Sequence, residues 1–169
     1  MTMSDPNKSA QPSFVLLHMG KYRFGLASSA VTELSPAVKL HTFPHTTPKI
    51  EGVIVCRSGI VPVYEVASSM AEAQAPARRF YLVAKRQNTD GETDCAIPVD
   101  GDCELRNAEM APPPEGRPPY VSGILNGYTP AIDVIDLEKL LTYVPRETLQ
   151  VPAIEYAAPE SRDVPGAGR

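Results

Sequence analysis

Short runs of apolar and β-branched residues, separated by turn signals, recur along most of the chain. Residues 14–27, FVLLHMGKYRFGLA, hold two such runs around Gly20-Lys21, which predicts a hairpin. Residues 52–66, GVIVCRSGIVPVYEV, predict a second hairpin that turns at Arg57-Ser58-Gly59. Closely spaced short strands of this kind are typical of a small β-barrel or sandwich.

The second half of the chain repeats this pattern. Residues 78–100 predict a hairpin whose polar loop contains Asp90-Gly91. Residues 120–135 predict a further hairpin that turns at Asn126-Gly127. The chain therefore divides into two sets of hairpins, and we expect a connector between the sets near residues 68–77.

Helical signals are few and short. Residues 136–144, DLEKLLTYV, predict a helix capped by Asp136, because its leucines lie three and four positions apart on one face: Leu137, Leu140 and Leu141. Residues 28–35, SSAVTELS, predict a helical turn capped by Ser28 or Ser29. Residues 38–44 predict another strand, which ends at Pro44.

The ends of the chain differ from its middle. Residues 1–12 are polar and predict a disordered lead, whereas residues 144–169 contain Pro, Ala, Glu and Arg without a period and predict a disordered tail. The folded domain is expected over residues 13–143. A proline-rich segment at 112–119 interrupts its second half.

Composition agrees with an all-β fold. The 169 residues include 18 prolines, too many for a helical bundle, and their 43% apolar content supports one domain or two small packed subdomains. A net charge of −4 argues against nucleic acid or an anionic membrane as a partner. Without a spanning apolar segment or an apolar signal core, we expect a cytoplasmic protein that does not insert into a membrane.

Motifs that would indicate catalysis are missing from the sequence. It has no Gly-rich phosphate loop, GxSxG, HExxH or CxxC, so no catalytic residue, metal site or cofactor is predicted. His41 and His45 are four positions apart, but Pro44 between them rules out the shared helical face that metal ligands would need. Asp133 and Asp136 could form a paired acid, although Asp136 is better explained as the helix cap.

The remaining candidate groups are three cysteines and two aspartates. Cys56, Cys95 and Cys103 are odd in number and widely spaced, which favours free, mostly buried thiols over a disulfide framework. Arg57 beside Cys56 could lower the pKa of that thiol, but alternation along a strand favours Cys56 as a core residue. The aspartates around Gly101, at positions 100 and 102, are expected to be turn residues.

Arg57 is the residue that the hairpin pattern does not explain. A charge removed from water without a partner costs several kcal/mol, so its guanidinium cannot simply join the valines and isoleucines around it. Arg57 must lie on a turn, pair with an acid, or face something outside the chain.

Four blocks of the chain, over about residues 13–143, resemble the CheW-like family of chemotaxis coupling proteins. The most specific block is similar to the family pattern G-V-x-N-x-R-G-x-x-x-P-V-x-D-L, with matches at Gly52, Val53, Arg57, Pro62 and Val63. The step Val99-Asp100-Gly101 and the closing residues 136–141, DLEKLL, match as well. The chain departs from the pattern at Val55, Ser58, Glu65 and Asp102 and in its proline-rich segment, which is compatible with a divergent pathway such as pilus motility.

The resemblance implies an all-β fold of two SH3-like, five-stranded β-barrel subdomains packed together, with one short C-terminal helix. It implies a non-catalytic adaptor that joins the cytoplasmic tip of a chemoreceptor (a methyl-accepting chemotaxis protein) to the regulatory domain of a CheA-type histidine kinase. Because that kinase domain has the same double-barrel fold in the family, adaptor and kinase can meet end to end. A receptor tip is a helical hairpin, and a groove between the barrels would give it apolar walls.

The resemblance also implies partner-binding residues. Arg57 corresponds to the family's arginine near the receptor-binding surface, and Val31 and Glu33 match positions of the same region, with Glu33 a candidate partner for Arg57. Gly52 would let the backbone turn tightly before its strand, and Phe80 matches a position linked to kinase contact. The alternatives are a solvated turn for Arg57, core packing for Val31 and Phe80, and a surface acid for Glu33.

Two other functions remain open at this point. One is a divergent CheW-like module that binds only one of the two partners. The other is a thiol- or metal-dependent enzyme that uses Cys56, Cys95 or Cys103.

Overall fold

The structure is a computed structural model that describes residues 11–44, 47, 49–70, 73–77 and 80–145. The expected disordered lead and tail lie almost wholly outside the described residues, as does His45, and stay predictions. None of the described helices is long and apolar enough to span a membrane. The elements are β1 (Ser13–Met19), β2 (Tyr22–Ala27), η1 (Ser28–Ala30), β3 (Val31–Pro36), β4 (Ile50–Cys56), β5 (Gly59–Tyr64), η2 (Ala67–Ser69), β6 (Phe80–Asn88), β7 (Gly91–Asn107), β8 (Met110–Ala111), β9 (Val121–Leu125), β10 (Ile132–Ile135) and α1 (Leu137–Thr142).

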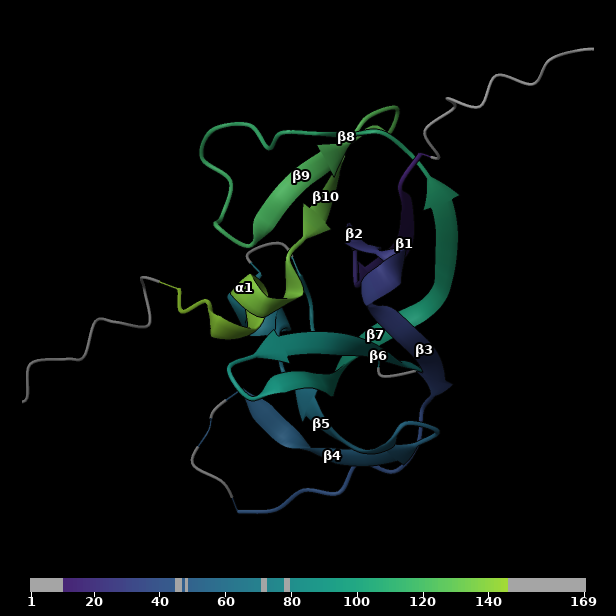
Figure 1. Cartoon of the computed structure of the whole chain (residues 1–169), viewed down its shortest axis with the longest axis vertical. Coiled ribbons are helices and arrows are strands. Elements are labelled where there is room, and N and C mark those ends of the chain that lie inside the picture. The colour runs from purple at the N-terminus through teal and green to yellow at the C-terminus, as the bar shows by residue number, and fades with distance from the viewer. Residues whose placement is uncertain (1–10, 45–46, 48, 71–72, 78–79, 146–169) are drawn as a thin grey trace, which may run out of the picture.

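The strands form two β units that share the long strand β7 (Figure 1). Barrel I consists of β3, β6, the first half of β7, β5 and β4. Barrel II consists of the second half of β7 with β1, β2, β10, β9 and β8. The expected all-β fold of two small packed β units with one short C-terminal helix is thus confirmed. Barrel I has the expected five strands, whereas barrel II has a sixth among the described residues, the two-residue β8.

All four predicted hairpins are present, namely β1–β2, β4–β5, β6–β7 and β9–β10. The β4–β5 hairpin shows why the sequence forms them. Its residues alternate between the two faces, so that Ile54 is fully buried whereas its neighbour Val55 is exposed. Arg57 and Ser58 form the turn, which settles how an arginine fits into this apolar stretch.

The order of the strands in space differs from their order along the chain. β1 and β2 belong to barrel II together with β9 and β10 from the far end of the sequence, and β2 pairs with β10 in parallel. Residues 68–77 lie between β5 and β6, which both belong to barrel I. The division near 68–77 that the sequence suggested therefore does not coincide with the boundary between the barrels.

Three local expectations are corrected. Only residues 28–30 form the helical turn, and residues 31–36 continue as β3, because their pairing with β6 outweighs a weak helical signal. Residues 38–44 form no strand beyond a single bridge from His41 to Val53. Residues 100–102 are not a turn but the middle of β7, where Asp100 Oδ2 and Oδ1 accept hydrogen bonds from Gly20 N at 2.6 Å and Ala77 N at 2.7 Å.

The buried side chains form three clusters. Each barrel has its own small core, centred on Ile54 and Val83 in barrel I and on Leu16 and Leu125 in barrel II. The third cluster lies between the barrels and includes the three leucines of α1, which confirms the helical face expected from their spacing. The space between the barrels is therefore largely filled, and α1 is part of what fills it.

Polar contacts fasten α1 at both ends. At its start Asp136 caps the helix by accepting a hydrogen bond from Lys139 N at 3.1 Å, as predicted. At its end Lys49 Nζ donates to Leu141 O at 3.1 Å and also to Tyr143 O. Lys49 comes from the segment just before β4, so it ties the helix that follows β10 to barrel I.

Candidate functional site

An apolar groove of about 490 Å³ runs along the junction of the two barrels. Barrel II contributes β1, β2, β8, β9 and β10, barrel I contributes β6, and η1 and the start of α1 complete the walls. The apolar residues in its lining are Pro12, Phe14, Leu26, Ala27, Ala30, Met110, Val134, Ile135 and Leu137. This groove is the part of the inter-barrel space that the central core leaves open.

Small side chains keep the groove open on one wall. Ala27 ends β2 and is exposed, and Ala30 ends η1 and is half-buried. Met110 of β8, which also lines the groove, is 47% exposed, although it is a large apolar residue. An exposed methionine beside a concave apolar surface is typical of adaptable protein-binding sites.

The charges along the groove neutralise one another within the protein. Arg86 of β6 donates from Nε to Glu138 Oε2 at 2.9 Å and from its NH2 group to Glu138 Oε1 at 3.1 Å. A third donor of Arg86 reaches Tyr64 OH at 2.7 Å. The hydrogen bond to Glu138 is the main reason that the pKa of Arg86 is raised. Apolar surface is therefore what the groove offers to a partner.

The predicted site residues lie in barrel I, and none of them lines the groove. Val31 comes closest, since it directly follows Ala30 and pairs with Ala84 of β6. Arg57 is exposed at the β4–β5 turn. Glu33 and Arg57 form no ion pair within the described part of the chain; Glu33 instead lies near the thiol of Cys56, where its charge adds to the rise in the pKa of that thiol.

Gly52 and Phe80 have packing roles in the structure. Gly52 lies inside β4 and not before it, and a Cβ atom there would be 2.4 Å from the backbone oxygen of His41. Phe80 begins β6, pairs with Pro36 and Val99, and packs against the central core. A partner-binding role for either residue stays a prediction.

The outer face of the β4–β5 hairpin carries exposed apolar side chains. Val55 and Ile60 are opposite each other in the register and are 58% and 75% exposed. Val53 and Pro62, the next pair on this face, are half-buried. We call these four residues the hairpin face. A contiguous exposed apolar patch of this kind indicates a protein–protein contact.

The cysteines do not have the environment of a reactive thiolate. Burial raises the pKa of Cys56, and it raises the pKa of Cys95 to about 12, which is the opposite of activation. Cys103 is exposed on β7. In the described ranges, no three His, Cys, Asp or Glu side chains come together as a potential metal site.

The groove residues Phe14, Ala27, Ala30 and Met110 were missed by the sequence reasoning. Their positions come from elements that are distant in the chain, since β2, β6 and β8 meet only through the sheet order. The one available signal was the pair of alanines around the short helical turn, where larger side chains would close the space.

Two packed barrels with an apolar groove at their junction define a protein-binding module. The chain belongs to the CheW-like domain family, whose model matches residues 13–144. Among solved structures, the fold is similar to the scaffolding protein TtCheW from Thermoanaerobacter tengcongensis, with a TM-score of 0.65 and 20% sequence identity, over 82% of this chain and 93% of that one. No curated protein sequence matches the chain. Membership of the family supports a non-catalytic scaffold or adaptor role in chemotaxis signalling.

Proposed function

We propose that the protein is a cytoplasmic adaptor that binds the helical tip of a chemoreceptor and the regulatory domain of a CheA-type histidine kinase. The observation that carries the proposal is the apolar groove at the barrel junction. An amphipathic helix binds such a groove by laying its apolar face against the walls.

The groove suits a helical partner in shape and chemistry. Ala27 and Ala30 allow a helix to approach the backbone closely, and Met110, which also lines the groove, can change rotamer to fit it. The Arg86–Glu138 pair already satisfies the charges nearby, so the partner need not supply a counter-ion.

Arg57 and Glu33 add a polar margin to the receptor contact in this proposal. The Arg57 guanidinium is exposed and offers a planar set of donors for a carboxylate or a backbone carbonyl. Val31 connects this region to the groove because it continues the chain from Ala30. Gly52 supports the same surface indirectly, by admitting the His41 backbone against β4.

The hairpin face is our candidate contact for the kinase domain. Val55 and Ile60 are among the most exposed large apolar residues of the described structure, and they lie outside the groove. The groove and the hairpin face share no residue, so the two partners could bind at the same time, with the Arg57 turn at the edge of the kinase contact. Phe80 supports barrel I by packing against the central core.

Calorimetric titration with an isolated receptor-tip hairpin tests the groove. The variant Ala27→Glu places a charge in the groove at an exposed position, and we expect binding to weaken about tenfold or more. Ala37→Glu is the matched control, since Ala37 is also exposed but does not line the groove. Equal affinities for the two variants would exclude the groove as the receptor site.

A parallel titration with the kinase regulatory domain separates the adaptor from a module that binds one partner. Ile60→Glu should weaken kinase binding about tenfold and leave receptor binding unchanged. Thr32→Glu, at an exposed position of β3, is the control. Absence of kinase binding by the unmodified chain would favour the one-partner module.

A further inference from the structure

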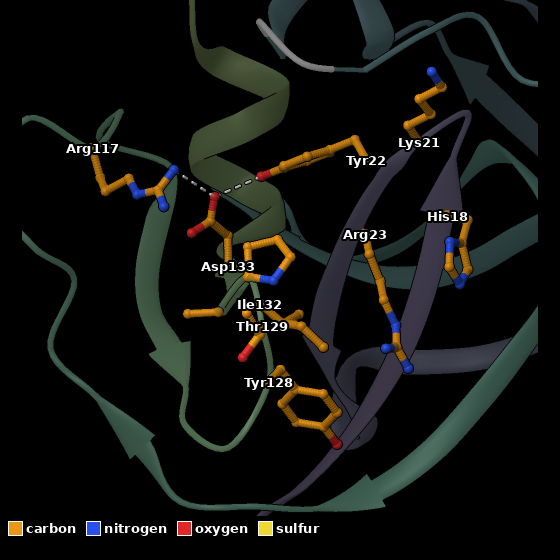
Figure 2. Close-up of a pocket in the computed structure, with 11 residues that line it drawn as sticks. His18, Lys21, Tyr22, Arg23, Arg117, Tyr128, Thr129, Ile132 and Asp133 are labelled. Carbon is orange, nitrogen blue, oxygen red and sulfur yellow. Dashed lines mark hydrogen bonds and ion pairs between the residues drawn. The ribbon is translucent and has the colours of Figure 1, made fainter.

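A second hollow, of about 360 Å³, lies at the end of barrel II and shares no lining residue with the groove. Figure 2 shows that its walls come from the β1–β2 turn, the loop between β9 and β10, and Arg117 of the proline-rich segment. We call it the end pocket. Its volume is within the range of small-molecule sites, which are often found at the mouths of β-barrels.

The end pocket is positively charged in a chain whose net charge is −4. Lys21, Arg23 and Arg117 line it together with His18, and the only carboxylate in the lining is that of Asp133. When Glu104, which pairs with Arg23 just outside the lining, is counted with Asp133, the three basic side chains Lys21, Arg23 and Arg117 still exceed the carboxylates by one charge. A cleft lined by one sign of charge concentrates ligands of the other sign.

One oxygen of the pocket's carboxylate is already engaged, and the other is buried without a hydrogen-bond partner among the described residues. Asp133 is only 4% exposed, and its Oδ2 accepts a hydrogen bond from Tyr22 OH at 2.9 Å and lies 3.3 Å from Arg117 NH1. Burial, and then the hydrogen bond to Asp133, raises the pKa of Tyr22, so this side chain stays a neutral donor. Asp133 therefore fixes the wall around Tyr22 and Arg117 and does not neutralise the other cations.

The remaining cations of the pocket have donors without acceptors. Arg23 is held in place, because one NH2 donor reaches Glu104 Oε2 at 2.8 Å and its Cζ atom lies 5.3 Å from the centre of the Tyr128 ring. Its Nε is buried and has no hydrogen-bond partner among the described residues, so the donors that a ligand can reach are those of the terminal nitrogens of this partly exposed side chain. Among the described residues, Lys21 and His18 have neither an ion pair nor a side-chain hydrogen bond. The Arg23 guanidinium is thus held in place, while most of its N–H donors have no acceptor among the described residues.

We propose that the end pocket binds a small organic anion, a molecule with a phosphate or carboxylate group on a flat, mainly apolar body. The guanidinium of Arg23 matches either oxyanion as a planar fork, and the Lys21 ammonium at the turn adds a second charge. The body of the ligand fits the rest of the lining, which contains Tyr22, Tyr128, Pro130 and Ile132. A hollow of this volume between two loops suits such a molecule better than it suits an extended acidic segment of a protein.

Two-dimensional ¹H–¹⁵N NMR of the full chain, titrated with four probes, tests this site. The probes are phenyl phosphate, benzoate, neutral benzyl alcohol and inorganic phosphate, each up to about 10 mM, which covers weak dissociation constants. We expect phenyl phosphate, benzoate or both to shift the amides of residues 18–23 and 128–133, and the stronger of the two identifies the oxyanion. Benzyl alcohol and inorganic phosphate should bind at least about tenfold more weakly, since each lacks one of the two recognised parts.

Variants assign the binding to the pocket. Lys21→Gln, at an exposed turn position, should weaken binding of the better organic anion several-fold, and Arg23→Gln should weaken it about tenfold or more. Lys39→Gln, an exposed cation of barrel I outside the pocket, should change nothing. Any of three results would overturn the proposal: no shift of the pocket amides, the same affinity in all three variants, or tighter binding of a tetraglutamate peptide than of either organic anion.

Discussion

The groove and the end pocket differ in which of their charges are already paired. In the groove, Arg86 and Glu138 bind each other through two hydrogen bonds, and the surface left over is apolar. In the end pocket, Asp133 engages Arg117 but leaves Arg23 with unfilled donors. The pairing of charges inside the protein, and not the number of charged residues around a hollow, therefore decides which ligand chemistry the hollow can receive.

Strand β10 passes from one site to the other. Its first residues, Ile132 and Asp133, line the end pocket, and its last residues, Val134 and Ile135, line the groove. β10 is buried along its whole length. The chemistry at each of its ends is therefore set by the side chains packed around it, and this lets the two sites differ over only four residues.

The largest effect is expected from Leu140→Ala, which removes a core side chain of α1. The start of α1 lines the groove, and no α1 residue lines the end pocket. Leu140 is 1% exposed in the core between the barrels. Its truncation should lower the free energy of unfolding by about 2–5 kcal/mol, measured by urea denaturation. Lys139→Ala on the outer side of α1 is the control and should cost less than about 0.5 kcal/mol. A loss below about 1 kcal/mol for Leu140→Ala would show that α1 is not part of the core.

Tyr22→Phe tests the wall of the end pocket. The loss of one hydrogen bond to a buried carboxylate should cost about 1–2 kcal/mol, after allowance for the partial exposure of Tyr22. Because the folded-state pKa of Tyr22 is raised, its contribution is fully present below about pH 10 and is lost as the pH rises above that value.

The pH dependence distinguishes this hydrogen bond from simple packing. Denaturation curves should show a smaller stability difference between the wild-type chain and Tyr22→Phe above pH 10 than at pH 7. Cys95 also loses its proton at high pH, but it is common to both chains and cancels in the difference. A difference that does not change with pH would contradict the role of the Tyr22 proton.

Arg86→Met removes the charge that is paired with Glu138 at the groove. The Arg86–Glu138 pair is partly exposed, so we expect a loss of stability of only about 1 kcal/mol. A double-mutant cycle with Glu138→Gln should give a coupling energy of about 0.5–1 kcal/mol. Receptor-tip affinity should stay within about twofold, because the pair is already satisfied inside the protein; a large loss of affinity would mean that the partner uses this charge.

Arg57→Glu should have the smallest effect on stability, below about 0.5 kcal/mol, because Arg57 lies exposed at the β4–β5 turn. Receptor-tip binding should nevertheless weaken several-fold if the guanidinium contacts the tip. Lys39→Glu makes the same charge change at another exposed position of barrel I and serves as the control. Identical affinities for the two variants would remove Arg57 from the receptor site.

Local patterns predicted the local structure of this chain well. Alternation and turn residues predicted the four hairpins, and the spacing of Leu137, Leu140 and Leu141 predicted α1. The same rules predicted a helical turn where β3 runs and a strand at 38–44, because single-residue preferences are weak beside pairing with a distant strand. The family resemblance, rather than the spacing of residues, supplied the double barrel.

The sites were harder to predict because they are assembled from distant parts of the chain. Tyr22 and Asp133 are 111 positions apart and meet only because β2 pairs with β10. From the sequence, Asp133 could be interpreted only as half of a possible paired acid with Asp136. The groove likewise depends on β7 being one strand of 17 residues that serves both barrels, whereas its two halves read as separate strands.

NMR of the chain labelled with ¹³C at its methionine methyl groups shows whether a receptor tip binds in the groove. Met110 is exposed on the wall of the groove, whereas Met19 and Met70 are buried in the core and serve as internal controls. On titration with a receptor-tip hairpin, the Met110 signal, assigned with Met110→Leu, should shift or broaden in step with binding while the core signals stay in place. Saturating binding by calorimetry with an unchanged Met110 signal would contradict the account.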